Sequence, residues 1–179
     1  MPKAAGFRPL SAAERRLAAS IFADRIDYAR VQVRRRSFFP LGLQSRTTAM
    51  APNGHLYFHP QSPLYRECFA ECAQGSLQGL FIHEMAHVWQ HQQGQRVWIW
   101  AGLEQLSRDP YGYRLKPGKS LAQYGLEQQA EILRHYFYLR QIPAQAAKMG
   151  LSAADLPPYQ DTLQAFLEHT GASAGSIRI

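Results

Sequence analysis

His83, Glu84 and His87 form the pattern His-Glu-x-x-His, whose residue types are those of a metal-binding hydrolytic site. An α-helix turns by about 100° per residue, so side chains four positions apart share a face and the two imidazoles can reach one point. Neutral imidazoles are suitable ligands for Zn²⁺. Glu84 lies next to that face, where a carboxylate can serve as general base toward water held by the metal. The pattern therefore predicts zinc-dependent hydrolysis.

The surrounding segment favours the helix that this chemistry needs. Residues 77–93 are predicted to form it, with Ser76 as N-cap and Gly94 as the stop. Its apolar residues predict burial on one side: Phe81, Ile82, Met85 and Val88. The five-residue pattern also arises by chance, and the alternative is two surface histidines flanking a glutamate on an unrelated helix. The apolar setting, an alternating strand before it and a carboxylate downstream favour the metal site.

A catalytic zinc site takes three protein ligands and leaves one position open. The metzincin pattern places a third histidine ten residues after the first, preceded by a glycine. Those positions are Gln93 and Gln90 here, so the metzincin pattern is not met. His91 follows His87 by one turn. Histidines at three successive turns are spread along the helix axis and do not converge on one point. We therefore expect His91 not to be a metal ligand, but to face solvent or to hydrogen-bond a ligand residue.

A second predicted helix, residues 121–140, carries Glu127 and Glu131 four positions apart, and the small Ala130 allows close packing against the His83–His87 helix. This arrangement resembles the gluzincin superfamily, whose second helix carries Glu-x-x-x-Asp. The resemblance implies that Glu127 is the third zinc ligand and that Glu131 orients His83 or His87 through a hydrogen bond. Glu131 is longer than the Asp of that pattern. The alternative is that both carboxylates are exposed helix charges.

The similarity extends beyond these motifs, over about residues 9–140. The segments SAAERRLAASIFADRIDYARVQV, NGHLYFHP, HEMAHVWQHQQG and GLEQQAEILRHYF together resemble small bacterial zinc metallopeptidase-like proteins described as Vgr-related or Rhs-associated. The most specific pieces are HVWQ and EQQAEI. Relatives of that family occur near contractile secretion systems. The resemblance implies a metal site more firmly than it implies a substrate.

Several other polar residues are candidates for a substrate cleft. His55, Tyr57 and His59 are predicted to share one face of a strand at residues 55–59, and zincins place an edge strand beside the metal. The alternative is that they are ordinary strand residues. Three tyrosines are candidate donors to the oxyanion of a tetrahedral intermediate, and the sequence does not rank them: Tyr111, Tyr113 and Tyr124.

The elements that position these residues predict an α+β fold, a small zincin-like domain rich in helix, with a small sheet and an edge strand beside the His83–His87 helix. We expect one domain over residues 1–179, with its core at about 9–140 and a helical extension at 144–170. Helices are expected at 11–30, with a capping box of Ser11 and Glu14, and at 64–74. A strand is expected at 30–36, a loop at 109–120 and a small polar tail at 171–179, while 96–106 is ambiguous.

Composition limits the remaining possibilities. Apolar residues make up 46% of the 179 residues and charged residues 18%, as in a globular protein. No apolar run reaches the about 20 residues of a membrane span, and no Sec signal is visible. We expect synthesis in the cytoplasm, with export without a cleaved signal left open. Cys68 and Cys72 are interpreted as small buried thiols rather than a disulfide.

The formal net charge is +7, and Arg34, Arg35 and Arg36 form a basic run. We interpret the run as a solvated strand end, because no nucleic-acid-binding signature accompanies it. No nucleic-acid partner and no membrane partner are expected. The predicted function is a zinc metallopeptidase, with Glu84 as general base and a peptide or protein substrate. The alternatives are a cell-wall amidase or endopeptidase effector linked to a contractile secretion system, and a non-catalytic secretion-associated adaptor. A secretion-system component or an inhibitory protein is a possible partner.

Overall fold

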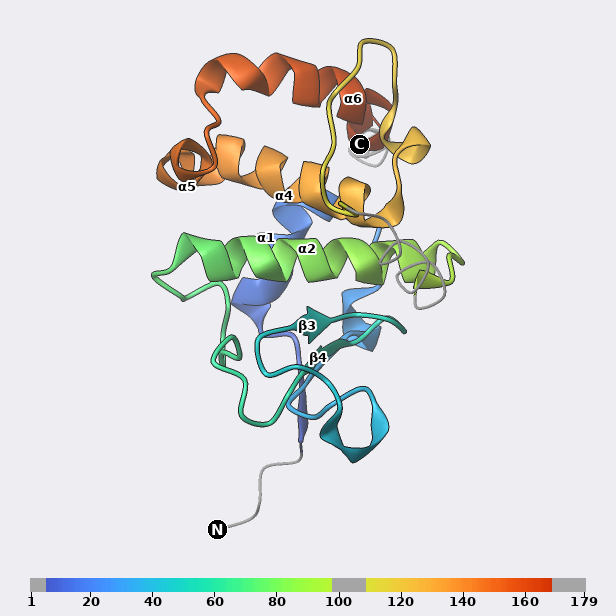
Figure 1. Ribbon diagram of the computed structural model, residues 1–179, viewed down its shortest axis with the longest axis vertical. Coiled ribbons are helices and arrows are strands. Elements are labelled where there is room, and N and C mark those ends of the chain that lie inside the picture. The colour runs from blue at the N-terminus through green and yellow to red at the C-terminus, as the bar shows by residue number, and fades with distance from the viewer. Residues whose placement is uncertain (1–5, 98–108, 169–179) are drawn as a thin grey trace, which may run out of the picture.

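The computed structural model describes residues 6–97 and 109–168, and it has an α+β architecture. A small sheet forms one side of the molecule and the helices stack above it (Figure 1). This confirms the α+β fold class predicted from the sequence. No helix among the described residues combines the length and the apolar character that crossing a membrane requires.

The sheet contains four short strands within the described residues: β1 (Phe7–Pro9), β2 (Gln32–Arg34), β3 (Ala49–Met50) and β4 (Leu56–Phe58). Their order is β1-β2-β4-β3. The pairs β1–β2 and β3–β4 are antiparallel and β2–β4 is parallel. The predicted strand at 55–59 exists as β4, but it is an interior strand. The prediction that it forms the sheet edge is wrong, because the two-residue strand β3 pairs with its free side.

The helices are α1 (Ala12–Phe22), α2 (Gly75–Gln92), α4 (Leu126–Gln141), α5 (Pro143–Lys148) and α6 (Leu156–Glu168). Short 3₁₀ turns occur at Tyr28–Arg30, Pro40–Gly42, Leu121–Gln123 and Ala153–Asp155. Ser11 and Glu14 form the predicted capping box of α1. Gly94 follows α2 with a φ of 82°, a left-handed conformation that suits the end of a helix.

Three predicted helices differ from the structure. The helix predicted at 11–30 ends at Phe22, where Ala23 takes a φ of 47°. The helix predicted at 121–140 starts only at Leu126, after a 3₁₀ turn. Residues 64–74 form turns, because side chains from elsewhere bind their backbone: Glu14 accepts from Phe69 N–H, and Gln78 donates to the carbonyls of residues 70 and 72. The predicted loop at 109–120 is present, and so are helices within 144–170.

Two predictions fall partly or wholly outside the described residues, namely the ambiguous segment at 96–106 and the tail at 171–179. Cys68 and Cys72 are free thiols and half-buried rather than buried.

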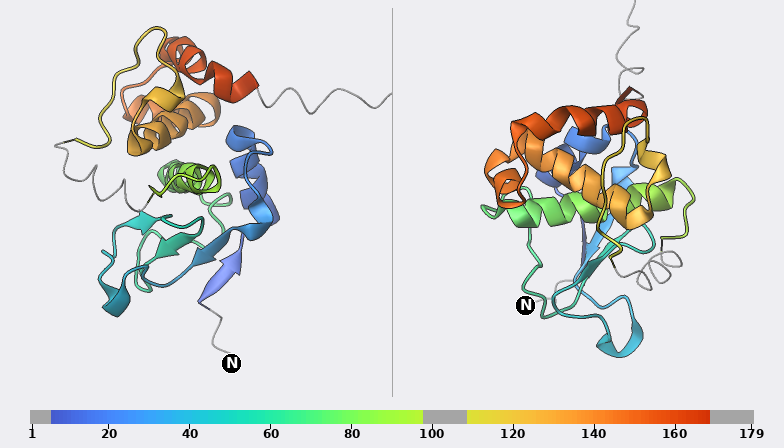
Figure 2. Two further views of the ribbon diagram at one scale, coloured as in Figure 1. Left: turned by 90° about the vertical axis from the view of Figure 1, so that its right-hand side faces the viewer. Right: turned by 45° about the horizontal axis from the view of Figure 1, so that its top comes forward.

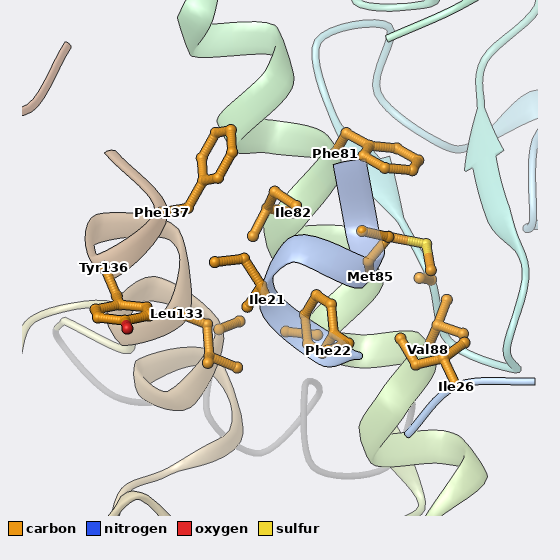
Figure 3. Close-up of a cluster of buried hydrophobic side chains, with 14 of the residues drawn as sticks. Ile21, Phe22, Ile26, Phe81, Ile82, Met85, Val88, Leu133, Tyr136 and Phe137 are labelled. Carbon is orange, nitrogen blue, oxygen red and sulfur yellow. The ribbon is translucent and has the colours of Figure 1, made fainter. Parts of the chain in front are cut away.

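The hydrophobic core lies where α1, α2 and α4 meet (Figure 3). Most of the labelled side chains lie between these helices, whereas Phe81 points toward the sheet and stacks on Phe69. The labelled residues are Ile21, Phe22, Ile26, Phe81, Ile82, Met85, Val88, Leu133, Tyr136 and Phe137. Leu163 and Phe166 of α6 join the same cluster, and the ring of Phe166 meets that of Phe22 edge to face at 6.2 Å. The segment predicted as an extension therefore contributes to the core.

Helix α2 lies between the sheet and α4, and α6 lies over α4 (Figures 1 and 2). Gly79 makes the crossing of α2 and α4 close, since a Cβ there would overlap the phenol ring of Tyr138. Ala130 of α4 is fully buried. These small residues bring the two helices close enough for side chains of α2 and α4 to meet.

Candidate metal centre

The two histidines of the His-Glu-x-x-His pattern lie on one face of α2 and are buried, with 7% exposure for His83 and 5% for His87. Their Nε2 atoms are 3.2 Å apart. The rings stand nearly perpendicular, at 83°, with centroids 4.8 Å apart. Helical spacing therefore brings the two imidazoles to one point, as the residue pattern requires.

Glu127, in the first turn of α4, supplies a third donor atom. Its Oε2 lies 3.2 Å from Nε2 of His83 and 3.2 Å from Nε2 of His87. Within the described residues, these three side chains are the group whose donor atoms could hold a metal ion. The structure thus brings together the three residues expected as ligands.

The spacing of the three donor atoms fits zinc. Tetrahedral bonds of about 2.0–2.1 Å place ligand atoms about 3.3 Å from one another. The three separations here are each 3.2 Å. A single cation above the triangle can therefore contact all three atoms without a large rearrangement.

The ring protons also favour a cation at this point. Nδ1 of His87 lies 2.8 Å from Gln90 Oε1, and Nδ1 of His83 lies 2.8 Å from Glu131 Oε1. Both neighbours are acceptors, so each neutral ring carries its proton on Nδ1 and turns an Nε2 lone pair toward the carboxylate of Glu127. Three acceptors that converge in a buried place repel one another unless a proton or a metal ion lies between them.

The pKa shifts of these groups also indicate that the cluster favours positive charge. Burial opposes the charged form of His83, but the adjacent carboxylates of Glu127 and Glu131 outweigh it and raise its pKa to about 9. The pKa of His87 is raised too, because Glu127 outweighs its burial. Desolvation raises the pKa of Glu127, but the two histidines lower it by more, because in their protonated forms they donate hydrogen bonds to its carboxylate. The cluster therefore holds a carboxylate and attracts a cation.

Gln90 is a site residue that the sequence reasoning missed. It is fully buried, accepts from Nδ1 of His87, and donates from Nε2 to Leu126 O at 3.0 Å and to Gln129 Oε1 at 3.1 Å. Gln129 in turn donates to Tyr124 O at 2.8 Å. This chain of donors leaves one orientation for each amide, so it fixes which nitrogen of His87 carries the proton. The signal was available: Gln90 lies three residues after His87, on the same helix face.

Glu131 orients His83 as Gln90 orients His87. The resemblance implied that Glu131 would orient one of the two histidines, and the structure places it beside His83. Its Oε1 contacts His83, while its Oε2 pairs with Arg134 and lies 3.7 Å from Nε2 of His135. Desolvation raises the pKa of the Glu131 carboxyl, but His83 and Arg134 lower it by more. A charged Glu131 keeps the imidazole of His83 oriented.

Glu84 lies beside the ligands with only 4% exposure. Among the residues that the structure describes, its Oε2 is buried and has no hydrogen-bond partner. Burial raises its pKa, and His83 and His87 offset only part of that rise. A carboxylate with raised pKa and a free oxygen is suited to take up and release a proton.

A cavity of about 310 Å³ opens onto the cluster. Glu84, Glu127, His83 and His87 form its polar wall, and the remaining wall is largely apolar: Phe38, Phe39, Thr48, Ala49, Met50, Ala51, Pro52, Val97 and Tyr111. The edge strand β3 contributes both of its residues. The metal cluster and an apolar hollow beside a sheet edge therefore form one site.

His55, Tyr57 and His59, expected as possible residues of a substrate cleft, do not line this cavity, because β3 separates β4 from it. The hydroxyl of Tyr57 receives hydrogen bonds from Arg34 and Asn53, and its ring packs behind Phe38 at 5.2 Å. His59 accepts from the N–H of residue 61 through Nδ1, in the turn after β4.

His55 lines a separate polar hollow, together with His91. His91 is exposed and lies against Gly54, away from the metal cluster. Tyr124, also expected at the cleft, uses its hydroxyl to accept from Lys116 N–H and to donate to the carbonyl of Arg114. Neither His55 nor Tyr124 lines the cavity at the cluster.

Of the three tyrosines considered as oxyanion donors, the structure places Tyr111 at the cavity. Its ring centroid lies 6.2 Å from that of His83, and burial and the nearby carboxylates raise its pKa, so it stays a protonated donor. Tyr113 instead hydrogen-bonds Tyr159, at 2.6 Å between the hydroxyls. Of the three, Tyr111 is therefore the one that lines the cavity at the cluster.

Comparison with known sequences and with solved structures finds the same relative in both. The chain is 44% identical over 140 residues to the type VI secretion system spike protein VgrG2b of Pseudomonas aeruginosa, a match that spans 76% of this chain and 13% of that protein. The solved structure of the effector domain of Pseudomonas aeruginosa VgrG2b is similar over 92% of this chain and 83% of that one, with a TM-score of 0.69 and 38% sequence identity. No protein-family model matches the chain.

Proposed function

This chain belongs to the family of the VgrG2b effector domain, and from that premise we propose that it is a zinc-dependent metallopeptidase delivered as a type VI secretion effector. The observation that carries the enzymatic part is the cluster of His83, His87 and Glu127, whose donor atoms have the mutual spacing of zinc ligands. The observation that supports delivery is the relationship to a spike protein of that secretion system.

In this proposal, His83, His87 and Glu127 would hold the ion at the wall of the cavity. When bound there, zinc would supply an activated water and a Lewis acid for a substrate carbonyl. Glu84 accepts a proton from the attacking water and delivers it to the leaving amine. The raised pKa of Glu84 suits both steps, because a group that accepts and then donates a proton works best when its pKa is closer to the working pH than that of a free carboxyl group. Tyr111 donates a hydrogen bond to the developing oxyanion.

A peptide substrate is favoured by the shape of the site. Strand β3 is one of the two edge strands of the sheet within the described residues and forms part of the cavity wall. An extended peptide can add to such an edge through backbone hydrogen bonds. The apolar wall next to the metal cluster then accepts an apolar side chain beside the scissile bond. Phe38, Met50 and Val97 are the residues that shape this pocket.

The second candidate function is hydrolysis of amide bonds in cell-wall peptides, and the similarity to an effector domain supports it. It uses the same zinc site and the same Glu84. A non-catalytic adaptor is disfavoured, since a structural metal site has no use for a buried carboxyl group with a free oxygen.

The test combines metal analysis with hydrolysis assays on wild type, Glu84→Gln, Glu127→Ala and the exposed control Glu71→Gln. We expect one zinc per wild-type chain, zinc without activity in Glu84→Gln, and loss of bound zinc in Glu127→Ala. Casein and a peptide library, assayed beside purified peptidoglycan, separate the two substrate classes. Full activity of Glu84→Gln, or full zinc occupancy in Glu127→Ala, would overturn the proposal.

A further inference from the structure

The loop between β2 and β3 presents three large apolar side chains to solvent. Phe39 is 43% exposed, Leu41 97% and Leu43 74%. We call these three residues the apolar tip. The loop projects from the sheet on the side away from α4 and α6 (Figures 1 and 2). Folding gains nothing from apolar side chains that stay in water, so their display needs another explanation.

The loop is held in one conformation rather than frayed. Gln44 is 4% exposed and lies at the base of the loop, where its Oε1 accepts from Phe38 N–H and its Nε2 donates to the carbonyls of Thr48 and Tyr57, each at 2.9 Å. Leu41 itself has a φ of 56°, a left-handed conformation that a leucine seldom adopts. The fold therefore fixes the apolar tip in its exposed position.

The same part of the chain carries most of the net charge. Residues 28–66 contain six arginines, no lysine and no acidic residue, which makes +6 of the total of +7. Arg36 and Arg46 are exposed next to the apolar tip in sequence, and Arg35 is exposed while its guanidinium stacks on Tyr65. The remainder of the molecule is close to neutral. The apolar tip thus belongs to a stretch of chain whose charged side chains are all positive.

We propose that the apolar tip and its arginines form a docking surface for an anionic lipid bilayer. Leucine and phenylalanine side chains enter the interface between headgroups and acyl chains, while guanidinium groups stay at the level of the anionic headgroups. A bilayer accepts a projecting tip without a shaped receptor. A nucleic acid would use the arginines but would leave the leucines in water. Phe39 also lines the metal cavity, so docking sets the mouth of that cavity close to the membrane surface.

Membrane docking departs from the sequence-based expectation of a solvated strand end without a membrane partner. The sequence shows the basic run, but only the structure shows that Leu41 and Leu43 are exposed beside it. Docking does not depend on hydrolytic activity, so it can be tested with the Glu84→Gln protein.

The experiment is co-sedimentation of the full chain with vesicles of phosphatidylcholine alone and with vesicles that also contain phosphatidylglycerol. We expect binding to the anionic vesicles that weakens with salt, and little binding to the neutral ones. The double variant Leu41→Ser/Leu43→Ser should bind about tenfold more weakly or worse, since a tenfold loss equals about 1.4 kcal/mol and one buried leucine contributes at least that much. Arg36→Ser/Arg46→Ser should also lose about tenfold.

Two matched control variants test whether the location of the substituted side chains matters, rather than the loss of arginine or apolar residues in general. Arg15→Ser/Arg16→Ser makes the same charge change on exposed positions of α1, and Met149→Ser removes an exposed apolar side chain from the helical side. Both should bind like wild type. In a separate measurement, Leu41→Trp should give a blue-shifted emission on anionic vesicles. Wild-type protein that ignores anionic vesicles, or leucine variants that bind them fully, would refute the proposal. So would tighter binding to duplex DNA that is insensitive to the leucines.

Discussion

Replacement of Gln90 by methionine tests whether the orientation of His87 contributes to metal affinity. Methionine has nearly the same volume, so the change removes three polar contacts while leaving the core filled. Those contacts are the acceptor for His87 Nδ1–H at 2.8 Å and the donors to Leu126 O and Gln129 Oε1. Without the acceptor, His87 can place its proton on either nitrogen, and only one of the two forms offers Nε2 to a metal.

The expected magnitude follows from the fully buried position of Gln90. Loss of the group that orients a histidine ligand weakens metal binding by about 10–100-fold. That range equals about 1.4–2.8 kcal/mol. The buried acceptor Gln129 Oε1 also loses its donor, which costs about 1–3 kcal/mol of folding stability. Zinc affinity and apo-protein stability should therefore fall together.

The assay is competition for zinc with a chromophoric chelator at neutral pH, with thermal unfolding of the metal-free protein as a check on folding. Gln93→Met is the matched control, since Gln93 is an exposed residue of the same type one turn further on. It should bind zinc like wild type. If folded Gln90→Met protein keeps wild-type affinity, the chain from Tyr124 through Gln129 and Gln90 does not control His87, and the reasoning fails.

Two further predictions concern the elements that position the site. Gly79→Ala should destabilise the protein by about 1–3 kcal/mol or more in thermal unfolding, because the new Cβ overlaps the Tyr138 ring, and a second substitution, Tyr138→Leu, should restore part of the loss. Glu14→Gln should cost about 2–3 kcal/mol, since it leaves the Arg8 guanidinium without its charged partner. Burial raises the pKa of Glu14, but Arg8 and the N–H groups of Phe69 and Ser11 lower it further, to below 4.5. Its contribution is therefore complete above about pH 4.5 and is lost as pH falls through the folded-state pKa, so the wild-type and Glu14→Gln stability curves should converge in acid.

Helical periodicity explains why the metal cluster could be predicted from sequence. The spacing of His83 and His87 fixes their common face once the segment is helical, and the apolar residues around them make that helix hard to misplace. The position of Glu127 could not be predicted from helical periodicity alone, because its distance from the two histidines depends on how α2 and α4 cross. The resemblance to a known arrangement supplied that information, while the small Ala130 was consistent with it.

Features that depend on long-range pairing were not predicted. Alternation at 55–59 indicates a strand, but it does not say which strands flank it. β3 is only two residues long and has no alternation to detect, yet it takes the edge beside the cavity. Residues 64–74 have helical composition, but the side chains of Glu14 and Gln78 bind their backbone groups instead. The placement of Tyr111 at the site likewise depends on the path of a loop.

The site combines residues on the packed helices α2 and α4 with residues from the loop and edge strand at 38–52. The ligands and their orienting groups all lie on α2 and α4, whose crossing is fixed by a glycine and a buried core. The apolar wall comes mainly from residues 38–52, which form turns and the edge strand, and of these Ala49 and Ala51 belong to the core cluster. Under the proposed function, changes in this wall should alter which substrate side chain is accepted, or how the tip of the loop meets its surroundings, without moving His83, His87 or Glu127. In this proposal, the residues on α2 and α4 carry the chemistry, and the wall formed mainly by residues 38–52 determines which substrate is recognised. Substitutions at Phe38 or Met50 should change substrate preference at constant zinc affinity, whereas substitutions at Gln90 should do the reverse.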